Sequence, residues 1–271
     1  MMERKLFFWD ARGLYIGPAF GLRPHRNAVA VFCVALDASA SLAHYPLCPA
    51  QGGFAFKTAL IPPNTLHHLH AAEDQRMAFL YIDALSDDYT RLLWTMRLHG
   101  ARVATMHERE QTLIEALRAL AAGACWRDAR DALTTLLGLT PAQTRDPRIV
   151  DALTRLRDAP DDRHSLTQCA QHAGLSASYF LHLFKAQTGV PFRRYRLWIR
   201  MGAALKAVRA GHSLTDAAHA AGFSSSAHFS TAFTGMFGLP PSRLSGPDII
   251  AAASEVRPRG PRCQESNALY S

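Results

Sequence analysis

An internal repeat in the last hundred residues constrains the fold of this chain more than any other feature. The segment LTQCAQHAGLS at 166–176 aligns with LTDAAHAAGFS at 214–224, at an offset of 48 residues. After one inserted residue the offset becomes 49, and four further residues match in order: Phe180, Phe184, Gly189 and Pro191 correspond to Phe229, Phe233, Gly238 and Pro240. Chance does not supply so many matches in sequence, so we expect one small structural unit built twice.

Each copy predicts two helices joined by a tight turn. A serine before each helix can cap its first turn, and a glycine in the left-handed conformation can end the first helix. The two phenylalanines stand at i and i+4, which gives the second helix one buried face. The capping serines are Ser165 and Ser176 in the first copy and Ser213 and Ser224 in the second, and the turn glycines are Gly174 and Gly222. This pattern is a helix-turn-helix written twice.

The segment 192–209 between the copies predicts one long, arginine-rich helix. At 1.5 Å per residue it would span roughly 27 Å, near one turn of B-DNA. Charge supports a nucleic-acid partner, because residues 148–246 hold 12 Lys and Arg against five Asp and Glu, whereas residues 1–147 are almost balanced at 15 against 14. Nearly all of the net charge of +8 therefore lies in the repeat region.

The N-terminal half is written in a different style. Short β-rich runs at 14–17, 29–36, 54–61 and 77–82 alternate with Pro, Gly and Asn clusters, which predicts a small barrel or sandwich. Helical patterns follow at 108–122 and 126–138. The fold class is therefore α+β, with a β-barrel and its following helices over 1–140, a linker at 141–147, an all-α domain over 148–246 and a tail without regular structure at 247–271.

With these residues in place, the stretch 148–245 resembles the DNA-binding domain of the AraC/XylS family of transcription regulators. The repeat, the linking helix with Arg200 and Ala204, and the run from Gly222 to the Phe237-Gly-Leu-Pro-Pro segment carry the resemblance. It implies that two helix-turn-helix units enter successive major grooves of double-stranded DNA. It also implies a cupin-like sensing domain that binds a small-molecule effector, with a second copy of the chain and RNA polymerase as further partners and no cofactor.

The resemblance assigns DNA contacts to the second helix of each unit and to the start of the linking helix. Ser178 and His182 can reach base edges, whereas Lys185 favours phosphate. The second unit departs from the family, since Thr231 and Thr234 replace the usual Arg and Lys, so we expect the first unit and the linking helix to dominate affinity. The assigned residues are Ser176, Ala177, Ser178, Leu181, His182, Lys185, Arg193, Arg194, Arg196, Ser225, Ser226, Ala227, Ser230, Thr231 and Thr234.

The N-terminal half resembles a cupin domain, less closely than residues 148–245 resemble the family's DNA-binding domain. ALIPPNTLH at 59–67 approximates the second cupin motif, with Asn64 in the usual glycine place, but the first motif keeps only one histidine near His25 and no glutamate. A catalytic metal needs about three protein ligands, so we expect none here and no catalytic residues. The residues assigned to effector binding are His25, Phe32, Phe56, His67 and Tyr81.

Three functions stay open at this point: an effector-controlled regulator, a cupin metalloenzyme fused to a DNA-binding module, and an effector-free regulator whose first domain only dimerises. Leu113, Leu117 and Leu120 form an apolar stripe that serves either a dimer contact or packing on the chain's own barrel. Five cysteines without a CxxC pair, no secretory signal and a longest apolar run of nine residues indicate a cytoplasmic protein without a membrane span.

Overall fold

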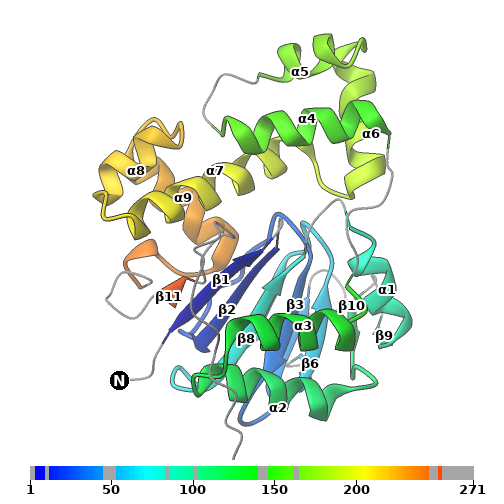
Figure 1. The fold of residues 1–271 in the computed structure, drawn as a ribbon, viewed down its shortest axis with the longest axis vertical. Coiled ribbons are helices and arrows are strands. Elements are labelled where there is room, and N and C mark those ends of the chain that lie inside the picture. Colours follow the sequence, from blue (N-terminus) through cyan, green and yellow to red (C-terminus); the bar gives the residue numbers. More distant parts are fainter. Residues whose placement is uncertain are drawn as a thin grey trace, which may run out of the picture.

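Two β-sheets form the frame of the N-terminal domain (Figure 1). The computed structural model describes residues 4–9, 12–44, 53–82, 86–99, 103–139, 146–160, 165–243 and 250–251. The larger sheet has the strand order β11-β1-β2-β8-β3-β6-β10-β9 and the smaller β5-β4-β7, with every pair antiparallel except β1–β11. The strands are β1 (Lys5–Trp9), β2 (Arg12–Pro18), β3 (Val31–Ala35), β4 (Ala40–His44), β5 (Phe54–Phe56), β6 (Thr58–Ile61), β7 (His67–His70), β8 (Arg76–Tyr81), β9 (Arg97–His99), β10 (Val103–Thr105) and β11 (Ile250–Ala251).

Helices cover one face of the larger sheet. Beside the short α1 (Asp88–Trp94), helices α2 (Glu110–Ala121) and α3 (Trp126–Leu136) lie across the strands (Figure 1). Leu113, Leu117 and Leu120 are at most 3% exposed and pack against sheet residues such as Leu14 and Leu80. The apolar stripe therefore packs on the chain's own sheet, and its alternative use as a dimer surface is wrong.

After the sheet domain, the described part of the chain forms α4 to α9 and a short 3-10 turn, which contain the two predicted helix-turn-helix units. Helix α4 (Pro147–Asp158) precedes the first unit, α5 (Leu166–His172) and α6 (Ala177–Thr188); α7 (Phe192–Arg209) links it to the second, α8 (Leu214–Ala220) and α9 (Ser226–Phe237), and a short 3-10 turn, η2 (Pro241–Arg243), follows. The α+β class and the 18-residue linking helix are confirmed. The predicted linker is shorter than expected on its C-terminal side, because Asp146 caps α4 and Pro147 begins it.

Local capping explains why the two units form. Ser165 makes the full capping box with Gln168, and Ser176 and Ser213 accept from the backbone N–H groups of residues 179 and 216. The prediction that Ser224 caps α9 is wrong: Ser225 does so by accepting from the His228 backbone N–H. The inserted residue of the repeat thus precedes the cap. The Ser224 hydroxyl instead forms a hydrogen bond with His228 Nδ1, at 3.0 Å.

The predicted tail lies mostly outside the described residues. Its exception is β11, in which Ile250 and Ala251 pair in parallel with Lys5 and Leu6 of β1. No described helix is long and apolar enough to cross a bilayer.

Candidate DNA interface and interdomain cavity

The first helix-turn-helix unit has a core of its own. Phe180 and Phe184 are fully buried and pack, edge to face, on Phe192 at the start of α7. Residues of α4 and α5 complete this cluster, including Leu153 and the space-filling Cys169. The outer face of α6 carries all of the residues assigned to it from the sequence, and each of them is exposed: Ser176, Ala177, Ser178, Leu181, His182 and Lys185.

Tyr179 joins this exposed face, although sequence reasoning did not select it. Its side chain is 51% exposed on the first turn of α6, whereas large aromatic residues are usually buried. An exposed aromatic residue on a recognition helix has an apolar body and a hydroxyl to offer to DNA. The signal in the sequence was its place next to the core residue Phe180, on the outer face of the same helix as Ser178 and His182.

The arginines at the start of α7 differ in their solvent exposure and in their contacts with other side chains. Arg193 is exposed, but the Arg196 guanidinium lies 5.9 Å from the centre of the Phe192 ring. Arg194 is half-buried and donates from Nε and Nη2 to the Asn64 side-chain oxygen at 3.3 and 3.2 Å. Burial, with a smaller contribution from the Arg26 charge, lowers the pKa of Arg194. Arg193 is therefore the one of these three side chains that is exposed.

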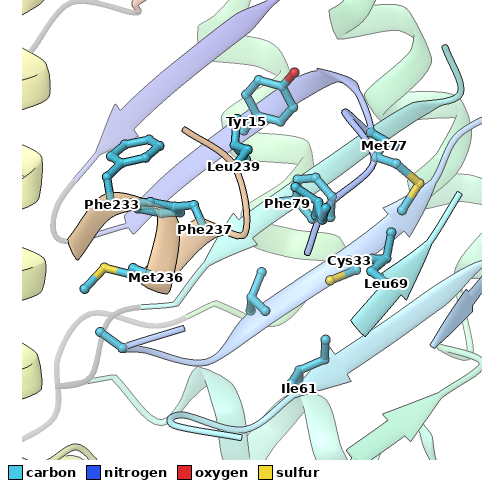
Figure 2. Packing of buried hydrophobic residues seen from close by; sticks show 14 of the residues in the cluster. Tyr15, Cys33, Ile61, Leu69, Met77, Phe79, Phe233, Met236, Phe237 and Leu239 are labelled. Atoms are coloured by element: carbon cyan, nitrogen blue, oxygen red, sulfur yellow. The ribbon is translucent and has the colours of Figure 1, made fainter. Parts of the chain in front are cut away.

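The second unit shares its core with the N-terminal domain. Phe229 and Phe233 belong to the same buried cluster as Cys33 and Phe79 of the larger sheet. Figure 2 shows Phe237 and Leu239, from the end of α9 and the turn after it, on the side of Tyr15 and Phe79, whereas the Met236 side chain points away from these sheet residues. Of the residues assigned to this unit, Ala227 and Thr231 are exposed, and the rest are half-buried: Ser225, Ser226, Ser230 and Thr234.

Polar contacts fix this docking. The Arg23 backbone N–H donates to the Gly238 carbonyl at 2.9 Å, and that of Arg26 to the Gly235 carbonyl at 3.4 Å. Gly238 ends α9 at φ +76°, and a Cβ there would lie 2.6 Å from His25 Nδ1 and 2.7 Å from the Arg23 carbonyl oxygen. Only glycine fits both the turn and the contact. Asn64, whose left-handed φ of +56° explains its place where cupins use glycine, completes the interface through Arg194.

A cavity of about 60 Å³ lies at this interface. Strands of the sheet domain line one side, and α7, α9 and the turn after α9 line the other. Its walls are mostly apolar, with a small polar corner made by His25, Asn27 and His67. The lining residues are Leu6, Tyr15, Phe20, Leu22, His25, Asn27, Val31, Cys33, His67, Leu69, Phe79, Tyr81, Leu205, Phe233, Phe237 and Leu239.

Three of the five residues assigned to the effector line this cavity: His25, His67 and Tyr81. Phe32 does not. It lies in the cluster beneath α2 and α3, because side chains alternate along β3 and Cys33 takes the inner position. Phe56 is buried among the inner residues but is not part of the cavity wall. Sequence reasoning missed Asn27 and the residues from α9, whose approach to the sheet depends on tertiary packing.

The polar corner of the cavity has a defined hydrogen-bond pattern. His67 Nδ1 donates to the Thr65 carbonyl at 3.0 Å and His25 Nδ1 to the Arg23 carbonyl at 2.8 Å, so Nε2 of each neutral ring is an acceptor. Asn27 Nδ2 lies 3.5 Å from His67 Nε2 and is its donor, which fixes the orientation of the amide. The Asn27 side-chain oxygen is then buried without a hydrogen-bond partner in the described structure.

Burial keeps these two histidines, hereafter the histidine pair, uncharged. It lowers the pKa of His25 from 6.5 to about 4 and that of His67 to about 3, with their mutual repulsion adding to the shift at His67. Their ring centres are 4.3 Å apart. Within the described residues, no three His, Cys, Asp or Glu side chains gather as they would around a metal ion.

This arrangement defines a DNA-binding helix-turn-helix protein with an attached antiparallel sheet domain. Residues 169–246 match a helix-turn-helix domain model of the AraC type. The chain matches no curated protein in sequence.

The fold of nearly the whole chain is similar to that of ToxT from Vibrio cholerae. An apo form of a ToxT variant gives a TM-score of 0.58 at 13% identity, covering 87% of this chain and 97% of that one. ToxT of strain O395 gives 0.57 at 16% identity, covering 86% and 95%. A ToxT structure with bound unsaturated fatty acid gives 0.52 at 13% identity, covering 86% and 94%. The match of residues 169–246 to the helix-turn-helix model confirms the sequence-based resemblance to AraC/XylS regulators, and these structures confirm the fold.

Proposed function

We propose that this protein is a sequence-specific DNA-binding transcription regulator whose second helix-turn-helix unit is controlled by a small molecule in the interdomain cavity. One observation carries the control: residues of the sheet domain and of α7 and α9 line the same cavity. A ligand there contacts both domains at once, so its affinity depends on whether they are docked. Differential affinity of this kind is what a ligand needs to shift a conformational equilibrium.

The asymmetry between the units supports this proposal. Among the described residues, the buried core of the first unit is formed with α4 and the start of α7, whereas the core of the second continues into the sheet domain. The comparison with the fatty-acid-bound ToxT structure adds that a protein of this fold takes a small molecule. It favours an effector-controlled regulator over an effector-free one, and the DNA-binding domain favours a regulator over an enzyme.

Further partners belong to the same proposal. We expect a homodimer on DNA, contact with RNA polymerase and a cytoplasmic location, as the AraC-type domain suggests. A dimer would have to use a surface other than the leucine stripe of α2, which is buried.

The first test is a selection of genomic DNA fragments by the purified full chain. The best site should contain two half-elements about one helical turn apart. Its affinity should fall steeply as salt rises, because Lys and Arg displace counterions from phosphates. Weak binding without sequence preference at both of two salt concentrations would contradict the proposal.

A second test compares the two recognition helices. His182 and Thr231 occupy equivalent exposed positions of α6 and α9, at an offset of 49 residues. We expect His182→Ala to weaken operator binding by about 1–3 kcal/mol and Thr231→Ala by less, because the first unit has the stronger readers and an unhindered face. Equal losses would refute the dominance of the first unit.

A further inference from the structure

We infer that the interdomain cavity selects a small, uncharged hydroxyl compound with an apolar body, of about the size of phenol, and rejects carboxylates. The inference rests on the proposed function and specifies the ligand of the same site. It depends on three features of the cavity: the buried acceptors in its polar corner, the charges missing from its wall, and its volume.

The acceptors call for a hydrogen-bond donor. Asn27 is 3% exposed, and its Oδ1 has no partner in the described structure. The amide cannot relieve this by flipping, because the Thr65 carbonyl holds the proton of His67 on Nδ1 and makes His67 Nε2 an acceptor for Asn27 Nδ2. A buried acceptor without a partner costs about 1–3 kcal/mol, which a hydroxyl donor in the cavity would recover.

The wall of the cavity disfavours ions of either sign. Among the described residues that line it, none is Lys, Arg, Asp or Glu. A carboxylate carries no proton to donate and would meet the acceptors Asn27 Oδ1 and His25 Nε2. Protonating the histidine pair could compensate, but burial opposes that change. An ammonium group would find acceptors but no counter-charge, and burying an unpaired charge costs more than burying a paired hydroxyl.

The volume limits the apolar body. A cavity of about 60 Å³ holds a small cluster of waters or a compact organic molecule. That space suits a single ring and does not accommodate a long acyl chain without a larger opening. Aromatic side chains from both domains form much of the wall and can pack on a ring: Tyr15, Phe20, Phe79, Tyr81, Phe233 and Phe237.

The experiment compares three matched fluorinated probes with the full chain by ligand-observed ¹⁹F NMR: 4-fluorophenol, fluorobenzene and 4-fluorobenzoate. We expect 4-fluorophenol to bind at least tenfold more tightly than fluorobenzene, because a site built to bond a hydroxyl strongly rejects the analogue without it. We expect no binding of 4-fluorobenzoate at neutral pH. Equal affinity for the phenol and fluorobenzene, tighter binding of the benzoate, or binding of none of the probes overturns the inference.

Two variants locate the effect. Asn27→Leu removes the acceptor with little change of shape and should reduce the preference for the phenol over fluorobenzene to within about threefold. Phe32→Leu is the matched control, since Phe32 neighbours the cavity residue Cys33 but lies on the opposite face of β3, and it should keep the full preference. If Asn27→Leu keeps the preference as well, the inference is overturned; the comparison of probes on the unmodified chain stands whether or not the variant folds.

Operator affinity, measured with and without 4-fluorophenol, separates the two proposals. Selective phenol binding that changes operator affinity supports both. Selective binding without any change in operator affinity supports the chemistry of the cavity and overturns its regulatory role. Operator affinity that responds to 4-fluorobenzoate and not to the phenol overturns the inference and supports effector control.

Discussion

The ring pair Tyr81–Phe237 offers a direct test of whether the second unit is docked on the sheet domain in solution. Tyr81 ends β8 and Phe237 ends α9, and their rings meet edge to face with centroids 5.5 Å apart and planes at 87°. Such a pair contributes about 0.5–1.5 kcal/mol beyond the area it buries. We therefore expect a coupling free energy of about 1 kcal/mol between Tyr81→Leu and Phe237→Leu, each of which alone should destabilise the protein by about 1–3 kcal/mol.

The assay is a double-mutant cycle. The free energy of unfolding of each variant of the full chain is measured by urea denaturation, with circular dichroism and tryptophan fluorescence as the two probes of unfolding. Trp198 is a suitable reporter because its ring lies 5.3 Å from Tyr81 and 6.1 Å from Phe237. Phe184 and Phe192 form the matched control, since their rings have the same 87° angle at 5.2 Å but lie wholly within the first unit and α7. Both cycles should give similar coupling.

The control decides how a null result is interpreted. Distant sites are additive within about 0.3–0.5 kcal/mol. If Phe184–Phe192 shows coupling of about 1 kcal/mol and Tyr81–Phe237 shows none, the two domains are not docked in solution. The shared core, the cavity and the proposed control would then all lose their basis.

Three further predictions concern stability, each checked by urea denaturation. Ser225→Ala should cost about 1 kcal/mol because it removes the N-cap of α9, whereas Ser224→Ala should change stability by less than about 0.5 kcal/mol; the reverse order would restore the cap predicted from the sequence. Asp88→Ala should cost about 3–5 kcal/mol, because it removes the carboxylate that lies 2.7 Å from the buried Arg12 guanidinium. Replacing Asp88 by Leu and Arg12 by Met together should recover most of that loss. The free energy of unfolding should fall as pH drops below about 6.5, because the two histidines take up protons at that pH in the unfolded chain, whereas in the folded chain their pKa values are about 4 and about 3. The slope reaches up to about 2.7 kcal/mol per pH unit for two protons. Urea midpoints that stay flat between pH 7 and 5 would contradict the burial of neutral rings.

Local signals made the C-terminal domain predictable. Capping serines, left-handed glycines and phenylalanines at i and i+4 act within a few residues of one another, so they are legible without knowledge of the tertiary fold. All four of the repeated phenylalanines are fully buried, and Gly189 and Gly238 end their helices at φ +70° and +76°. The wrong cap at Ser224 arose because the inserted residue could be placed on either side of a serine run.

The cavity was less predictable because its walls come from distant parts of the chain. Residues 28–36 are apolar without interruption, so alternation could not tell Phe32 from Cys33, and the larger residue was chosen wrongly for the interior. Asn27 gave no signal either, since its importance depends on the tautomer of His67, some 40 residues away. The strands β4 and β7 of the smaller sheet are only five and four residues long, and β7 (HHLH) consists mostly of histidine, which hides both strands from a pattern search.

The divergence of the repeat gives the direction in which an effector should act. Thr188 of the first unit corresponds to Phe237 of the second; the threonine hydroxyl donates to the Phe184 carbonyl of its own helix, whereas the phenylalanine packs on the sheet domain. Exposing a buried phenylalanine or leucine side chain costs about 1.5–3 kcal/mol. Releasing Phe237 and Leu239 from the sheet domain therefore costs several kcal/mol, which DNA contacts of α9 must offset. Because both domains form the cavity, a ligand binds the docked state, and at 100 times its dissociation constant it adds about 2.7 kcal/mol to that cost. We therefore expect an effector to weaken operator contacts of the second unit and to leave those of the first unchanged; footprinting with saturating ligand that shows both half-elements equally weakened would refute this.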